Sequence, residues 1–189
     1  WLARRVAGDA LPAPMAYPAK LGRWPAAIGI LAFAWLELVS TTRGDPSGFP
    51  RIVNYEFRPI RFVQIPNAVL MLYSVNQTWR IIWTDGRKLP EDPDPRWFGY
   101  SVGRWEDDTT FIVDTVGMTD RTWVDSRGFP HSEALRVQER YRRASQNVIE
   151  LTVTIDDPEV YTKPWISRDR LALKRLPDDT DFLEQIYAA

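Results

Sequence analysis

The feature that most constrains this chain is a regular succession of short apolar or alternating runs after residue 46. The clearest run is residues 149–155, IELTVTI, in which apolar and polar side chains alternate. A period of two places one face of a strand in a core and the other toward water. Turn residues separate the runs at intervals of about ten, which is typical of an antiparallel barrel or sandwich.

The same criteria divide the segment into individual strands and loops. Pro90, Pro93 and Pro95 exclude a central strand, so the stretch around them is expected to be an extended loop across one end of the barrel. Strands are predicted over 51–57, 60–65, 68–75, 77–83, 97–104, 109–115, 119–124, 133–144, 147–156, 168–175 and 181–187. The sequence shows no solenoid or propeller repeat.

A hairpin is predicted over residues 97–115, WFGYSVGRWEDDTTFIVDT. Tyr100 lies on one face of the first strand, and Gly99 and Gly103 lie on the other. An acidic turn at 105–108 leads into a second run that is rich in β-branched residues. The two glycines indicate either a bend in a curling sheet or a place where a ligand approaches bare backbone.

Two long runs in the chain resemble a family of uncharacterised, usually exported bacterial proteins. They are TDGRKLPEDPDPRWFGYSVGRWEDDTTFIVDTVGMTDRTWVDSRGFPHSEALRVQERY and LTVTIDDPEVYTKPW, and the resemblance spans roughly residues 48–187. It implies an all-β, antiparallel, lipocalin-like (calycin-type) barrel and names no mechanism. It also implies a periplasmic or extracellular location.

The first 45 residues differ in composition from the rest, which divides the chain into 1–45 and 46–189. Basic residues precede the apolar run 24–39, whose only charge is Glu37, and this predicts an N-terminal hydrophobic helix. The run is short of the roughly 20 residues that cross a bilayer. An export signal, a membrane attachment through residues 24–39, a helix covering the barrel and an unrelated extension all stay open.

Composition excludes several classes of function. Lys+Arg total 24 and Asp+Glu total 25, giving a net charge of -1, so no global field favours nucleic acid as a partner. The absence of cysteine excludes disulfides, thiolate metal sites and a cysteine nucleophile. A single histidine rules out multi-histidine metal sites, and neither a metal nor a cofactor is expected.

His131 is the first catalytic candidate because the ordinary pKa of histidine suits proton transfer near neutral pH. Residues 119–123 and the strand beginning near Ser132 are joined by a short connection. Antiparallel pairing of the two would place His131 opposite Trp123, with Asp120 and Arg121 within a few residues. The alternative is that His131 is a hydrogen-bonding staple at a junction between loop and strand.

Asp114 is the second candidate because it lies among apolar strand residues and is therefore expected to face the barrel interior. There it would act as a catalytic carboxylate or pair with an arginine such as Arg104, Arg121 or Arg140. The predicted catalytic residues are His131, Asp120 and Asp114.

Aromatic residues are numerous enough either to fill a barrel or to line a cavity in it. The predicted ligand-binding residues, at the barrel mouth, are Tyr100, Trp105, Trp123 and Arg121. Three functions follow: binding of a small hydrophobic or aromatic molecule, cofactor-independent proton transfer or hydrolysis by His131 with an acidic partner, and a structural or interaction module attached to a membrane. A cavity reaching His131 favours the enzyme, and a filled barrel favours the module.

Overall fold

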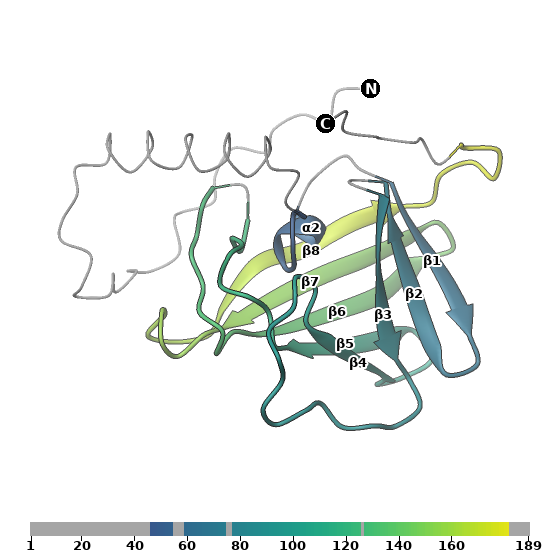
Figure 1. Ribbon diagram of the computed structural model, residues 1–189. Coiled ribbons are helices and arrows are strands. Elements are labelled where there is room, and N and C mark those ends of the chain that lie inside the picture. The colour runs from purple at the N-terminus through teal and green to yellow at the C-terminus, as the bar shows by residue number, and fades with distance from the viewer. Residues whose placement is uncertain (1–45, 55–58, 75–76, 126, 182–189) are drawn as a thin grey trace.

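The computed structural model describes residues 46–54, 59–74, 77–125 and 127–181, which form one mixed sheet of eight strands. The sheet curls into a half-barrel with its strands in sequence order, and one short helix lies on its concave side (Figure 1). The elements are α2 (Arg51–Asn54), β1 (Ile60–Ile65), β2 (Ala68–Tyr73), β3 (Thr78–Trp83), β4 (Tyr100–Trp105), β5 (Thr110–Val116), β6 (Arg136–Ser145), β7 (Val148–Asp156) and β8 (Trp165–Lys174).

Neighbouring strands pair antiparallel except β3 and β4, so the sheet is mostly antiparallel and departs from the expected antiparallel barrel at this one pairing. These two strands pair in parallel through Ile82 with Ser101 and Trp83 with Val102. Parallel pairing needs a crossover of a dozen or more residues, and the proline-containing connection 84–99 supplies it. As predicted, the stretch around Pro90, Pro93 and Pro95 forms no strand, whereas the strand predicted from residue 97 begins only at Tyr100.

Two predicted strands are wrong. Residues 51–54 form α2, with the Ile52 N–H donating to the Gly48 carbonyl at 3.0 Å, and all four are buried. Residues 119–124 form turns, because their backbone bonds to other loops: the Thr119 N–H donates to the Arg96 carbonyl at 3.0 Å. The helix predicted over 24–39 and, apart from Asp181, the strand over 181–187 lie outside the described residues.

The concave side of the sheet is packed with side chains. Gly103 shows how closely: a Cβ there would lie 2.3 Å from Cζ of Phe111 and 2.8 Å from Cγ2 of Ile82. The bare backbone at Gly103 therefore accommodates Phe111. The buried cluster consists of Phe49, Ile52, Val53, Met71, Tyr73, Ile82, Phe111, Val113, Met118, Val124, Leu135, Val137, Tyr141, Leu151, Val153, Ile155 and Tyr161.

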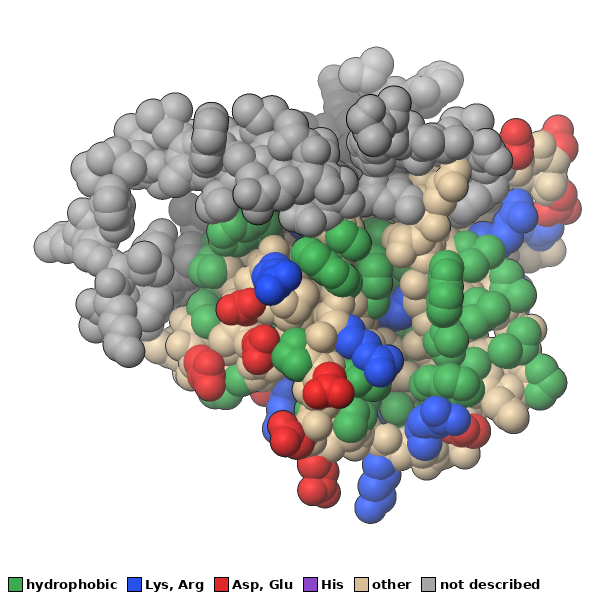
Figure 2. All heavy atoms as spheres, in the orientation of Figure 1, with side chains coloured by type: hydrophobic (Ala, Val, Ile, Leu, Met, Phe, Trp, Pro, Cys, Tyr) green, Lys and Arg blue, Asp and Glu red, His purple; other side chains and the backbone are tan. Residues whose placement is uncertain are grey.

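The outer face of β1, β2 and β3 is also apolar. Leu70 pairs with Val63 on one side and Ile81 on the other, and Trp79 and Ile65 on the same face are 58% and 42% exposed. Hydrophobic side chains gather on this side of the molecule (Figure 2). These strands therefore lack the one-sided pattern that β7 shows.

Candidate functional site

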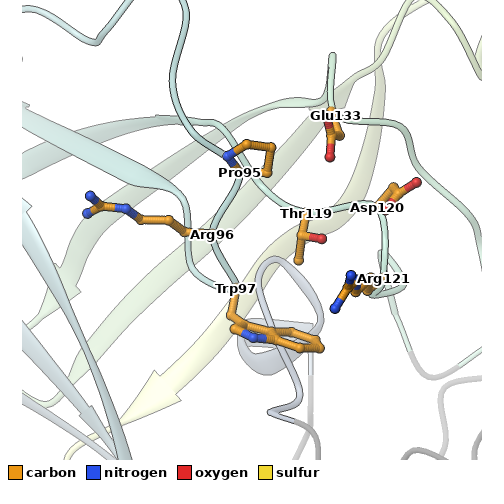
Figure 3. Close-up of a pocket in the computed structure, with 7 residues that line it drawn as sticks. All are labelled: Pro95, Arg96, Trp97, Thr119, Asp120, Arg121 and Glu133. Atoms are coloured by element: carbon orange, nitrogen blue, oxygen red, sulfur yellow. The ribbon is translucent and has the colours of Figure 1, made fainter.

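A cleft of about 350 Å³ opens where three connections meet at one end of the sheet (Figure 3). The segment before β4, the segment after β5 and the segment before β6 contribute to it. Backbone hydrogen bonds join the first two walls, with the Arg96 N–H donating to the Gly117 carbonyl at 2.9 Å. The lining residues are Pro95, Arg96, Trp97, Thr119, Asp120, Arg121 and Glu133.

The cleft combines an indole with charges of both signs. In the view of Figure 3, Glu133 points toward Thr119 from above, and Arg121 and the ring of Trp97 lie below. Arg96 points away from them, and its guanidinium carbon lies 4.2 Å from the ring centroid of Tyr100. Within the described part of the chain, no ion pair engages Arg121 or Glu133. Both charges are therefore available to a ligand.

His131 does not line this cleft and is only 6% exposed. Its Nδ1 donates to the Ser132 carbonyl at 3.0 Å, and the Thr122 hydroxyl donates to its Nε2 at 2.8 Å. These partners fix the neutral ring with its proton on Nδ1. Burial lowers the pKa of His131, although the Ser132 carbonyl and the charges of Asp157 and Asp120 oppose the shift.

The loop that carries His131 is held by the connection between β7 and β8. Asp157 accepts hydrogen bonds from the Ser132 N–H at 2.6 Å and the Ser132 hydroxyl at 2.9 Å. The Tyr161 hydroxyl donates to the Pro130 carbonyl at 2.6 Å, and burial raises the pKa of Tyr161. These are the contacts that a hydrogen-bonding staple requires.

The contact between Thr122 and His131 also has the donor and acceptor arrangement of a hydroxyl nucleophile beside its base. Access to the hydroxyl is restricted, since Thr122 is 4% exposed. Its methyl group packs against Gly48, where a Cβ would lie 2.2 Å from Cγ2 of Thr122. A larger residue than glycine at position 48 would therefore clash with Thr122.

The structure brings together only part of the ligand-binding set. Arg121 lines the cleft. Tyr100 does not line it, but the ring of Tyr100 contacts the guanidinium of Arg96, which does. Trp123 is partly exposed and is not a cross-strand neighbour of His131, because residues 119–124 are not a strand.

Trp105 lies at the far end of β4 from Tyr100 and is 56% exposed. Its ring centroid lies 5.0 Å from that of Phe111, and it lines a separate hollow with residues 106–108 of the hairpin turn. Trp105 therefore does not join the cleft.

Of the two acidic candidates, Asp120 lines the cleft and Asp114 does not. Asp114 lies on the outer face of β5, where it pairs with Arg104 and accepts a hydrogen bond from Nε2 of Gln138 at 2.8 Å. The expectation that Asp114 faces the interior is wrong, because the alternation of β5 turns Val113 and Thr115 inward. Arg104 is one of the arginines that the sequence analysis names as possible ion-pair partners of Asp114.

The interior holds a polar group that sequence reasoning did not single out. Nη2 of Arg80, on β3, lies 2.5 Å from Oε2 of Glu139, on β6, and the two side chains are 2% and 0% exposed. The Tyr141 hydroxyl donates to the other oxygen of Glu139 at 2.6 Å. The available signal was a charged residue at an inward position of an alternating strand, as in residues 137–141, VQERY.

Electrostatics hold Arg80 and the neighbouring Tyr73 and Tyr141 each in one protonation state. Burial alone would lower the pKa of Arg80, but Glu139, Tyr73 and Tyr141 together raise it above its ordinary value. Burial also raises the pKa of Tyr73 and of Tyr141. Arg80 therefore stays charged, and both tyrosines stay neutral.

Comparison with protein-family models, curated proteins and solved structures gave no match to this chain. Agreement with a calycin-like fold is coarse and rests on the curled, mostly antiparallel sheet. No helix among the described residues is both long and apolar enough to span a membrane. The same residues contain no group of three or more His, Cys, Asp or Glu side chains placed to hold a metal ion.

Proposed function

We propose that this protein binds a small aromatic molecule that carries an anionic group, in the cleft at the end of the half-barrel. The observation that carries the proposal is the presence of Trp97 and the unpaired Arg121 in one cleft. A planar ring stacks on an indole, and a guanidinium pairs with a carboxylate through two parallel hydrogen bonds. Because buried side chains fill the concave side, a site at this end is favoured and a ligand cavity inside the half-barrel is not.

The acidic residues of the cleft narrow the class of ligand. Asp120 and Glu133 repel a second anionic group, so they favour a monoanion over a polyanion such as nucleic acid. The proposal keeps a periplasmic or extracellular location, which the resemblance to exported proteins supports.

Calorimetry with indole-3-acetate and with neutral indole tests this function. Indole-3-acetate is expected to bind about tenfold or more tightly than indole, because only the acid engages Arg121. Arg121→Gln should remove the difference, whereas Arg104→Gln, on the outer face, should preserve it. Equal binding of the two ligands, or an unchanged preference in Arg121→Gln, would show that the cleft does not serve this purpose.

A second function, ester hydrolysis or proton transfer, is favoured by the 2.8 Å contact between Thr122 and His131. His131 would act as the base and Thr122 as the nucleophile, with Asp120 close enough to influence the imidazole charge. Turnover of p-nitrophenyl esters by the wild type, lost in both Thr122→Val and His131→Gln, would support it. Absence of turnover, or equal turnover in all three proteins, would dismiss it.

A further inference from the structure

Arg80 has hydrogen-bonding capacity that the described residues do not use. Its side chain is buried, and among the described residues only Nη2 has hydrogen-bond partners: Glu139 at 2.5 Å and the sulfur of Met71 at 3.6 Å. Nε and Nη1 are buried without a hydrogen-bond partner in the described part of the chain. Buried charged donors are normally satisfied, because an unpaired one keeps its full desolvation cost. Two of the three guanidinium nitrogens therefore lack an acceptor among these residues.

The side chain that covers this guanidinium belongs to residues 48–54, here called the plug segment. The Phe49 ring is fully buried, with its centroid 4.2 Å from the guanidinium carbon of Arg80. A cation over a ring face is stabilised, but a hydrocarbon ring has no oxygen or nitrogen lone pair to accept the hydrogen bonds that Nε and Nη1 can donate. Phe49 thus fills the space beside Arg80 without satisfying it.

The plug segment is tied to the segments that form the cleft and the loop beyond it. The Phe49 N–H donates to the Trp97 carbonyl at 2.8 Å. Nδ2 of Asn54 donates to the Val124 carbonyl at 2.7 Å. Its only helix is the single turn α2 (Figure 1). A few local bonds therefore position the ring over Arg80.

We propose that the space filled by Phe49 is an occluded binding site for a small aromatic carboxylate. The ligand ring enters the apolar space of the Phe49 side chain, and its carboxylate accepts hydrogen bonds from the free N–H groups of Arg80. Glu139 already pairs with Nη2 of Arg80 and with Tyr141, so the ligand carboxylate takes the two nitrogens of Arg80 that Glu139 does not reach. The site uses no side chain of the cleft, so the two proposals stand or fall separately.

The plug segment acts as a competitor built into the chain. A ligand that binds only when Phe49 is displaced has an affinity reduced by the fraction of molecules in which the site is open. This site should therefore bind a ligand only weakly in the wild type, whatever the cleft binds. Replacing Phe49 by a smaller residue, with the rest of the plug segment unchanged, should open the site to a ligand.

The test uses Phe49→Ala in the full chain, with benzoate, benzene and benzylammonium as probes in ligand-detected NMR titrations. Benzoate is expected to bind this variant about tenfold or more tightly than the wild type, and more tightly than either other probe. Any apolar cavity admits benzene. Equal or stronger binding of benzene or benzylammonium, or no binding of benzoate, would overturn the proposal.

Two controls separate the guanidinium from the cavity and from the cleft. Adding Arg80→Met and Glu139→Gln to Phe49→Ala removes both charges of the interior pair, so the preference for benzoate over benzene should vanish. Adding Arg121→Gln instead should leave the preference intact, and its loss there would assign benzoate to the cleft and sink the proposal. If Phe49→Ala does not fold, Phe49→Leu carries the same comparison of three probes, with the same deciding outcomes.

Discussion

Two buried polar networks in this molecule differ in how completely their groups are satisfied. In the loop network, both ring nitrogens of His131 and both oxygens of Asp157 have partners. In the interior network, Glu139 uses both oxygens, but Arg80 leaves two nitrogens without an acceptor among the described residues. The four residues are similarly buried, between 0% and 6% exposed.

The difference teaches that burial alone does not distinguish a structural group from a poised one. The neutral imidazole of His131 gives up little on burial, because each nitrogen exchanges water for a protein partner. A buried guanidinium with one carboxylate keeps a large desolvation cost that the pair offsets only in part. The satisfied network therefore has the properties of a staple, and the incomplete one has the properties of a site that awaits an acceptor.

The largest expected effect comes from breaking the interior pair. Glu139→Gln leaves the charge of Arg80 buried with a neutral partner, and the free energy of unfolding should fall by about 3–5 kcal/mol. Urea denaturation measures this loss. Glu150→Gln is the matched control, because Glu150 pairs with Arg142 at 2.7 Å on a more exposed face and should cost about 1 kcal/mol or less. Equal losses in the two variants would remove the special status of the interior pair.

Breaking the loop network should cost less. Asp157→Asn weakens the charge-assisted bonds to the N–H and hydroxyl of Ser132, and a loss of about 1.5–3 kcal/mol is expected in the same measurement. Asp169→Asn is the control, because its carboxylate is 64% exposed and its contact with Arg170 is 3.7 Å long. A loss at Asp157 no larger than the loss at Asp169 would contradict a stapling role.

The sequence predicts best those strands whose own apolar and polar side chains alternate. Residues 147–156 were predicted as a strand from their alternation, and β7 spans Val148–Asp156. Residues 51–54 were mistaken for part of a strand because one helical turn is too short to show a period of 3.6 residues. Residues 119–124 have a composition that suits a strand, but their backbone bonds to other loops.

Contacts among the candidate residues were likewise predictable only where the residues are close in the sequence. Asp120 and Arg121 share a cleft, and His131 contacts the neighbouring Thr122, because a short connection limits how far these residues can separate. Arg80 and Glu139 are 59 residues apart and meet across the interior through the curl of the whole sheet. No local pattern encodes that meeting.

A smaller and pH-dependent effect should distinguish the loop network from every other group. The folded-state pKa of His131 is lowered from 6.5, chiefly by burial, so the unfolded chain binds this proton more readily. The stability it contributes is complete above about 6.5 and is lost as the pH falls through the folded pKa. His131→Gln should flatten the dependence of unfolding free energy on pH in this window. Because the chain has one histidine, an unchanged slope would show that His131 is not the titrating group.

The smallest expected effect concerns Asp114, whose place on the outer face separates it from both networks. Its side chain is 32% exposed, and its partners, Arg104 and Gln138, lie on β4 and β6. Water screens such a pair, so Asp114→Asn should change the free energy of unfolding by less than about 1 kcal/mol. Binding of indole-3-acetate should be unchanged, because no partner of Asp114 lines the cleft. A weaker ligand affinity in Asp114→Asn at unchanged stability would mean that the outer face of β5 takes part in binding, so the site would not be confined to the cleft.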